Sequence, residues 1–227
     1  SELGLTDLES VTGGVGFSGR LAELYRVNLC LRTASRIVVR FASFRCRDFP
    51  ELYRHGCRLP WGRFVRGATP VEFRVTCRNS RLMHTARVAE TLQAAVDQSL
   101  GRDPATAGER RQLVLVRIVD DIVELSIDSS GELLHRRGYR THIAAAPLRE
   151  TLAAGILHLL AWNGTERLAD PLCGTGTFLL EGALMATRKA PGLDREFAFM
   201  HWPGWRPGLW QQLCEEARRG EHPCTAA

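Results

Sequence analysis

The sequence predicts an α/β protein built from two regions, with the boundary near residue 142. Three stretches carry this prediction. Residues 71–77 alternate apolar and polar side chains, as a half-buried strand does. Residues 81–100 change to helical spacing, and residues 167–188 join a short apolar segment, a Gly-rich turn and a helix. Strands and helices that follow one another in this way pack as layers of helix on sheet.

Before residue 71 we expect two strands and two helices. Asp48 followed by Pro50 is typical of a helix start, because an Asp side chain accepts from free backbone N–H groups and Pro fits the first turn. The predicted elements are a strand near Leu8–Thr12, a turn at Gly13–Gly16, a helix from about Leu21, a strand at Ser35–Phe44 and a helix from Asp48 to about Gly56.

After residue 100 the sequence predicts a hairpin, two further short strands and two helices. Asp120 and Asp121 separate two apolar runs and suit a two-residue hairpin turn. The predicted elements are strands at Leu113–Val119 and Ile122–Asp128, a further strand or sheet edge at Leu133–Tyr139, a helix at Leu148–Trp162 with Pro147 at its start, a short strand at Arg167–Asp170 and a helix at Phe178–Arg188.

Composition and charge narrow the class of partner. With 44% hydrophobic residues the chain can bury a core, which excludes intrinsic disorder, and no uncharged apolar run approaches the length of a membrane helix. The formal net charge is +5, and residues 20–87 carry fifteen Arg against four acids, a local charge of +11. Arg-rich usage alone would explain the choice of Arg over Lys but not this crowding. The pattern favours a polyanion, most simply nucleic acid.

The cysteines indicate a reducing compartment. Their number is odd, their spacing is wide, and no C-x-x-C pair occurs, so neither a disulfide framework nor a structural zinc site is expected. We therefore predict a cytoplasmic protein with no metal. The seven are Cys30, Cys46, Cys57, Cys77, Cys173, Cys214 and Cys224.

One string carries chemistry. In LADPLCGTGT, residues 168–177, an apolar segment ends in a carboxylate, a Gly-x-Gly turn follows, and a helix begins at once. Glycines let backbone N–H groups approach a ligand closely, and a helix N-terminus favours negative charge. No Lys follows the second Gly, which excludes a Walker loop, and Leu179 stands where a dinucleotide-binding loop needs its third Gly.

The string resembles motif I of S-adenosylmethionine-dependent amino-methyltransferases. More narrowly, the chain is similar to the THUMP-domain RNA guanine-N2 methyltransferases, whose bacterial members modify large-subunit rRNA. Further stretches match this family in order along nearly the whole chain. They are Val11–Phe17, Ala34–Ile37, Leu134–Arg140, Ala146–Ala154, Ala190–Leu193 and the pair Trp210 and Gln211.

The resemblance implies a ferredoxin-like and THUMP region over residues 1–141 that holds RNA, followed over residues 142–227 by the beginning of a Rossmann-like methyltransferase domain. It also implies S-adenosylmethionine as cofactor and RNA as partner, with rRNA favoured over tRNA and 23S rRNA as the expected substrate, and no membrane partner. The implied donor-binding residues are Asp170, Pro171, Cys173, Gly174, Thr175, Gly176, Thr177 and, on the preceding helix, Thr151. The candidate RNA phosphate contacts are Arg136, Arg137, Arg140, Arg74, Arg78 and Arg81.

The chain departs from the family pattern at one point that matters for activity. The family holds its target amine with an N/D-P-P-Y/F motif, but no Pro-Pro occurs here and only 37 residues follow Ala190. We therefore assign no catalytic residue and expect these 227 residues alone to be inactive. Two alternatives remain open, a non-catalytic RNA-binding module and a DNA adenine methyltransferase. Covalent catalysis by Cys173 is disfavoured, because the thiol lies in the donor loop without a paired base.

Overall fold

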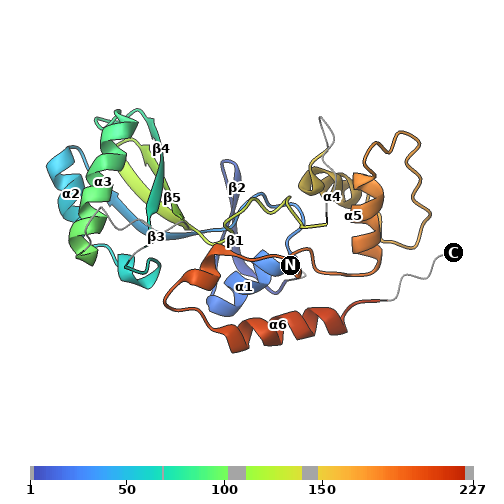
Figure 1. Cartoon of the computed structure of the whole chain (residues 1–227). Coiled ribbons are helices and arrows are strands. Elements are labelled where there is room, and N and C mark those ends of the chain that lie inside the picture. The colour runs from blue at the N-terminus through green and yellow to red at the C-terminus, as the bar shows by residue number, and fades with distance from the viewer. Residues whose placement is uncertain (1–2, 68, 102–110, 140–147, 223–227) are drawn as a thin grey trace. The chain divides into compact units, whose positions relative to one another are not determined.

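A computed structural model of the chain describes residues 3–67, 69–101, 111–139 and 148–222 (Figure 1). Its elements in chain order are β1 (Thr6–Val11), β2 (Gly14–Ser18), α1 (Leu21–Cys30), β3 (Val38–Arg45), α2 (Phe49–Cys57), a 3₁₀ turn (Trp61–Arg63), β4 (Val71–Arg78), α3 (Thr85–Leu100), β5 (Gln112–Val119), β6 (Ile122–Asp128), α4 (Glu150–Leu159), α5 (Thr177–Ala186), a 3₁₀ turn (Ala198–His201) and α6 (Pro207–Arg219).

The elements gather into two compact units, and neither unit is one continuous stretch of chain. The first unit takes residues 1–37, 132–196 and 206–227, and the second takes residues 38–131 and 197–205. The predicted boundary near residue 142 lies outside the described residues. The assignment of an RNA-binding region before it and a methyltransferase region after it concerns function and stays a prediction.

The second unit is built on a four-stranded sheet in the order β3-β6-β5-β4. The β5–β6 and β3–β6 pairs are antiparallel, and β4 and β5 are parallel, joined by the segment that contains α3. The predicted hairpin is confirmed: Asp120 and Asp121 both have positive φ, 52° and 62°, as a type I′ turn requires. Asp48 caps α2 as expected, its Oδ1 accepting a 2.7 Å hydrogen bond from the backbone N–H of Glu51.

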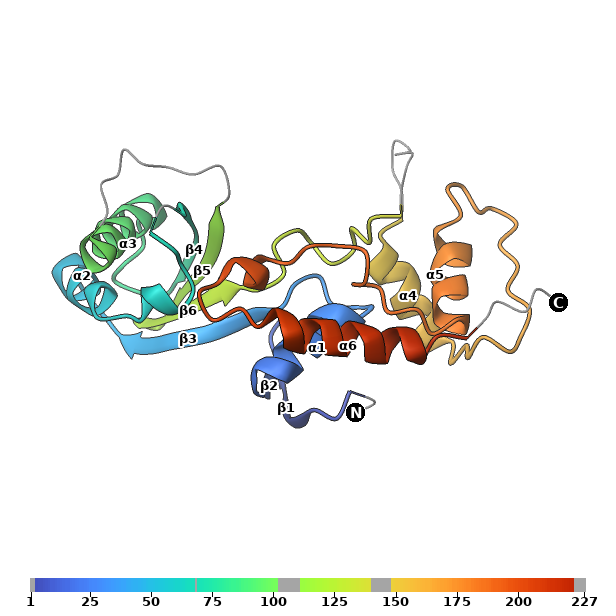
Figure 2. The same cartoon turned by 60° about the horizontal axis from the view of Figure 1, so that its bottom comes forward.

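One face of this sheet is buried and the other is open. Figure 2 shows α2 and α3 lying together beside the sheet. Alternate residues of β5 and β6 are buried, as is the apolar stripe of α3, which packs against β4 and α2 and explains the helical period of the sequence. The fully buried side chains of this core include Val114, Val116, Ile118, Val123, Leu125, Ile127, Val88, Leu92 and Val96.

The first unit combines a hairpin, β1 with β2, and four helices. Along α1 the buried residues Tyr25 and Leu29 face other parts of this unit: the Tyr25 hydroxyl accepts from the Arg206 N–H at 3.2 Å, and the Leu29 carbonyl accepts from the Gly192 N–H at 2.9 Å. The helices α4 and α5 pack against each other. No helix in the described part of the chain is long and apolar enough to cross a membrane.

Three predicted elements differ from the structure. Residues 14–16, expected in a turn, begin β2, and the turn is confined to two residues. Residues 133–139 form no strand. The N–H of Leu134 donates to the carbonyl of Ser35, a residue that itself belongs to no strand. Residues 167–170 run without helix or turn but pair with no strand among those described, so they form no sheet.

Candidate functional site

The Gly-rich loop of residues 170–176 leads directly into α5. Gly174 and Gly176 have φ of 53° and 72°, a left-handed backbone that glycine adopts without strain. The N–H of Gly176 donates a 2.7 Å hydrogen bond to the Cys173 carbonyl and closes a tight turn. A Cβ atom added at either glycine would meet no atom within 4 Å. The backbone of the loop therefore faces open space, as a surface that receives a ligand must.

The polar side chains of the loop are positioned locally. Oδ1 of Asp170 accepts a 3.2 Å hydrogen bond from the N–H of Leu172, which orients the carboxylate at the loop entrance. The hydroxyl oxygens of Thr175 and Thr177 lie 3.3 Å apart, and Thr177 is buried as the first residue of α5. Pro171 and Cys173 are exposed. Thus the loop combines one carboxylate with the positive N-terminal end of a helix.

The helix α4 supplies the remaining predicted donor-site residue. Thr151 is 6% exposed in the first turn of α4, and α4 packs against α5. Both helices also show apolar side chains to solvent, which is unusual for helices of a monomeric domain. The exposed apolar residues are Leu152, Ile156, Leu159, Leu160, Leu179 and Leu180. Leu172, in the Gly-rich loop, is exposed as well.

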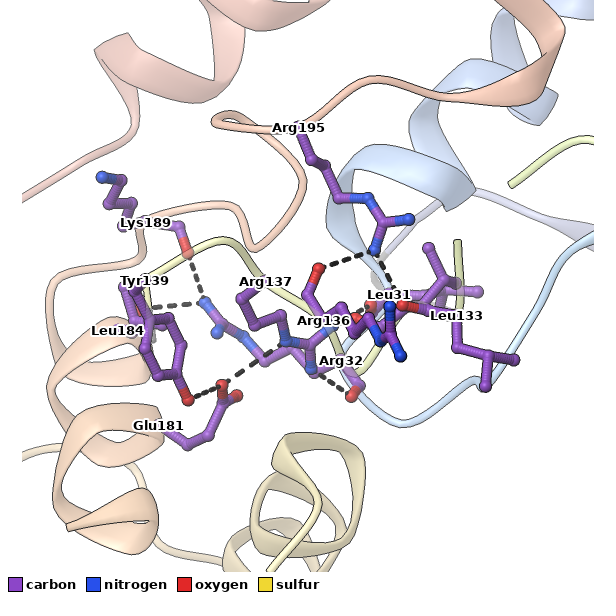
Figure 3. Close-up of polar contacts among 11 residues, drawn as sticks. Leu31, Arg32, Leu133, Arg136, Arg137, Tyr139, Glu181, Leu184, Lys189 and Arg195 are labelled. Carbon is purple, nitrogen blue, oxygen red and sulfur yellow. Dashed lines mark hydrogen bonds and ion pairs between the residues drawn. The ribbon is translucent and has the colours of Figure 1, made fainter. Parts of the chain in front are cut away.

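A buried ionic cluster includes Glu181 of α5, the helix that follows the loop (Figure 3). The Nε of Arg137 lies 3.4 Å from Oε1 of Glu181 on α5, and the two side chains are 2% and 0% exposed. The hydroxyl of Tyr139 donates a 3.0 Å hydrogen bond to the same Oε1. Arg32 belongs to the cluster: burial lowers its pKa, and the carboxylate of Glu181 opposes that shift. Among the residues that the structure describes, Oε2 of Glu181 and Nη1 of Arg32 have no hydrogen-bond partner.

This cluster corrects one sequence prediction. Arg137 was expected to contact RNA phosphate, but its guanidinium is enclosed and donates to the backbone carbonyls of Leu134, Leu31 and Arg32 as well as to Glu181. Such a side chain has no free donor face for a phosphate. Glu181 itself was missed. A signal exists, because Glu181 is the one charged residue in the otherwise apolar run FLLEGALMA.

The other predicted RNA contacts fall in different places. Arg136, in the first unit, is exposed and pairs with Glu132 at 3.1 Å. Arg81, in the second unit, is exposed, and its backbone N–H donates a 2.9 Å hydrogen bond to Asp121, which lowers the pKa of that carboxyl. Arg140 lies outside the described residues.

Arg74 and Arg78 share the open face of the sheet in the second unit. They are alternate, exposed residues of β4, on the face opposite the buried Val71. Pairing across the sheet brings three further exposed Arg to this face, because β4 residue 76 pairs with Arg117, and Arg117 pairs with Glu124 of β6. We call this set the arginine face. It consists of Arg40, Arg45, Arg74, Arg78 and Arg117, with Glu72 and Glu124 as its acids.

The arginine face keeps a surplus of positive charge. Glu124 is shared by Arg40 at 3.2 Å and Arg117 at 3.6 Å, and Glu72 lies 3.9 Å from Arg74. Five guanidinium groups therefore face two carboxylates. Within the residues that the structure describes, no three His, Cys, Asp or Glu side chains gather as a metal site would require.

Two parts of the chain match known families. Residues 137–226 match the family described as RMKL-like, methyltransferase domain, and this match contains the whole Gly-rich loop and Glu181. Residues 1–38 match the RlmL ferredoxin-like domain. The ferredoxin-like N-terminal part expected from the sequence is confirmed; the matches include no THUMP domain, and that expectation stays a prediction.

Named relatives and solved structures agree with these matches. A Synechocystis protein whose name marks it as a candidate RNA methyltransferase is 35% identical over 233 residues, which cover all of this chain and 61% of the relative. The ribosomal RNA large subunit methyltransferase K/L of Methylococcus capsulatus is 40% identical over 228 residues, 95% of this chain and 31% of the relative.

Two crystal structures share the fold. One, from Listeria monocytogenes, is described as a predicted N6-adenine-specific DNA methylase; its TM-score is 0.88 at 30% identity, over 97% of this chain and 59% of that one. The other, SMU.472, is described as a methyltransferase and was solved with S-adenosylhomocysteine; its TM-score is 0.87 at 28% identity, over 98% and 60% of the two chains. The predicted α/β class is thereby confirmed, and the chain spans about 60% of each structure.

Proposed function

We propose that the chain is the RNA-binding and partly donor-binding portion of an enzyme that methylates the exocyclic N2 amine of guanine in 23S rRNA, with S-adenosylmethionine as donor. The observation that carries the proposal is the Gly-rich loop at the start of α5, open to solvent and contained in the methyltransferase match. The K/L names of the relatives support ribosomal RNA as the substrate.

The loop fits the amino-acid part of the donor. The positive N-terminal end of α5 suits a carboxylate, and the carboxylate of Asp170 suits an ammonium group. The glycines leave space for close approach of a ligand on the open side. When bound, S-adenosylmethionine supplies an electrophilic methyl group. The residues of this chain then bind and orient, which is the main form of catalysis that such a transfer needs.

The arginine face suits the phosphate backbone of RNA. Guanidinium groups recognise phosphate through charge and paired N–H donors, and the five Arg are spread over neighbouring strands rather than gathered at one point. We propose this face, with Arg81 and Arg136 as further contacts, as the part of residues 1–141 that holds RNA.

A methylation assay tests the donor site. The full-length protein should transfer labelled methyl groups from S-adenosylmethionine to 23S rRNA, and Asp170→Asn should raise the donor KM at least tenfold. The control is Glu90→Gln, which changes an exposed carboxylate on α3 and should leave the KM for the donor and the KM for RNA unchanged. Absence of methylation on any rRNA or tRNA would refute the proposed activity.

A salt titration tests the RNA face. The double variant Arg74→Ala/Arg78→Ala should weaken RNA binding and reduce the slope of log Kd against log salt by about 1 to 2. With fewer phosphate contacts, fewer counterions are released when RNA binds. Arg54→Ala, an exposed Arg on α2, is the matched control. An unchanged slope in the double variant would remove the arginine face from the proposal.

A second candidate function is methylation of adenine in DNA, because the similar Listeria structure is described as a predicted N6-adenine-specific DNA methylase. The same donor loop would serve both reactions, so only the substrate distinguishes them. Equal amounts of 23S rRNA and double-stranded DNA offered together to the full-length protein should give label in RNA, in N2-methylguanosine after digestion. Label in N6-methyladenine of DNA would favour the second candidate.

A further inference from the structure

We infer that the buried pair of Arg137 and Glu181, together with Arg32, positions the Gly-rich loop for donor binding by fixing α5, the helix on which the loop ends. We call these three residues the arginine latch. The inference rests on the proposed function, because it gives the latch a role in the same donor site.

The latch holds α5 at two points along its length (Figure 3). Near the loop, Glu181 lies one turn after Thr177 and is held by Arg137 at 3.4 Å and by the Tyr139 hydroxyl at 3.0 Å. Near the far end of α5, Nη2 of Arg32 donates to the carbonyl of Leu184 at 2.9 Å. Two contacts separated along one helix fix both its position and its rotation.

The far end is held again just beyond the helix. The same Nη2 of Arg32 donates to the carbonyl of Lys189 at 2.6 Å. The backbone carbonyl of Arg32 in turn accepts from Arg137, so the two arginines are joined to each other. The segment that follows α1, which contains Arg32, is therefore tied to α5 by side chains of opposite charge and by backbone groups.

A different part of the α5 surface contacts the segment that enters the loop. A Cβ added to Gly182 would lie 2.6 Å from Cδ2 of Leu168, and one added to Gly164 would lie 2.8 Å from the Cα of Ala186. Residues 164–168 thus rest directly on α5. Since the loop begins beside this segment and ends at Thr177, both of its ends take their position from α5, while residues 171–175 between them are exposed.

Ionic side chains serve this role better than apolar ones of similar volume. Replacing a buried ion pair by apolar residues is often neutral for stability, because each charge costs free energy to desolvate. An apolar pair could therefore fill the space, but it would not fix direction. The planar guanidinium of Arg137 has donors at set angles, and they are met by Glu181 and by the carbonyl of Leu134 at 2.8 Å.

The test separates position from stability. In the full-length protein, Arg137→Met/Glu181→Leu keeps the volume buried and removes the charged pair, while Arg32 keeps its hydrogen bonds to the carbonyls of Leu184 and Lys189. We expect S-adenosylhomocysteine to bind at least tenfold more weakly by calorimetry, the donor KM to rise and the RNA KM to stay within twofold. The melting temperature without ligand should fall, because the buried Arg32 loses the carboxylate beside it, and the assays are therefore run well below that temperature. Amide hydrogen exchange at residues 170–177 should become faster, because α5 is no longer held in place and the loop that ends on it opens more often.

Two further variants keep the inference falsifiable. Glu181→Gln retains the shape and one acceptor, and it serves if the double variant melts too low to assay; it should show the same changes to a smaller degree. Lys189→Gln/Asp194→Asn removes an exposed ion pair of 2.8 Å from the same unit and should change none of them.

Two outcomes would overturn the inference: donor affinity within twofold of wild type in both latch variants, or unchanged exchange at residues 170–177. If the wild type binds no S-adenosylhomocysteine, the proposed function fails. The exchange measurement then still decides whether the latch fixes the loop.

Discussion

The indole Nε1 of Trp202 donates a 2.9 Å hydrogen bond to Oε1 of Gln112, ninety residues earlier in the chain. Both side chains are 5% exposed, and Nε2 of Gln112 donates onward to the carbonyl of Asp128 at 2.8 Å. The ring of Trp202 also meets Phe64 edge to face at 5.1 Å. One buried amide thus joins the segment of residues 197–205 to the central strands of the second unit.

Replacing this amide should destabilise the second unit. In Gln112→Leu the buried indole N–H and the Asp128 carbonyl lose their partner, which costs about 1–3 kcal/mol of unfolding free energy. Urea unfolding followed by tryptophan fluorescence measures the change. Gln212→Leu on α6, whose amide bonds Glu216 at an exposed position, is the control and should stay within about 0.5 kcal/mol of wild type. Equal effects of the two substitutions would contradict the prediction.

A side chain at residue 192 should also be costly. A Cβ added to Gly192 would lie 2.8 Å from the Cα of Leu29 and 2.9 Å from the carbonyl oxygens of Asn28 and Leu29, all of them backbone atoms that cannot turn away. We expect Gly192→Ala to lower the unfolding free energy by about 1–3 kcal/mol, as overpacking does. Gly208→Ala, in open space at the start of α6, should be neutral or stabilising by up to about 1 kcal/mol. Thermal melts of both variants compare them directly.

Cysteine alkylation should report the exposure of the Gly-rich loop. Burial raises the pKa of the Cys46 thiol to about 11, so at pH 8 only about one molecule in a thousand carries the reactive thiolate. Cys173 is exposed in the loop. In a Cys224→Ser background, mass spectrometry should find iodoacetamide on Cys173 first and on Cys46 only after unfolding.

The same labelling tests the donor site. In the full-length protein, saturating S-adenosylhomocysteine should slow the modification of Cys173, because a ligand bound over residues 170–177 covers the thiol. Cys57, a partly exposed cysteine at the end of α2, should be modified at the same rate with and without the ligand. Labelling of Cys173 at the same rate with and without S-adenosylhomocysteine would contradict the assignment of the loop.

Stability should fall in weakly acidic solution through one histidine. Burial, ahead of the nearby charges, lowers the pKa of His135 below its ordinary value of about 6.5. Below pH 6.5 the unfolded chain therefore binds a proton that the folded chain does not, and the unfolding free energy decreases as pH falls through the lowered pKa. His135→Gln should flatten this dependence in urea titrations between pH 7 and pH 5. An unchanged slope in His135→Gln would contradict the prediction.

Local signals in the sequence predicted much of the second unit. The alternation of residues 71–77, the helical period of α3 and the Asp120–Asp121 turn each specify structure through neighbours in the chain, and all three are confirmed. The strand expected at residues 133–139 failed for the opposite reason. Its apolar and basic residues resemble a strand, but their backbone partners come from residues 31–35, and nothing in the local pattern reveals them.

The site divides in the same way. The spacing of Asp, Gly and Thr over residues 170–177 predicted a tight loop directly before a helix, and the structure has this loop at the start of α5. For Arg137 the sequence shows only a basic residue in a basic stretch. Whether such a side chain meets solvent or a buried carboxylate depends on Glu181, 44 residues later, and that pairing appears only in the folded chain.

The division of the chain between the two units has a consequence for its synthesis. The second unit receives its last segment, residues 197–205, only after residues 132–196 have been made, and these belong to the first unit. On the ribosome, the sheet of residues 38–131 must therefore wait for about 70 residues before Trp202 can reach Gln112. During that interval Phe64 lacks the edge-to-face contact with the Trp202 ring that it makes in the complete fold.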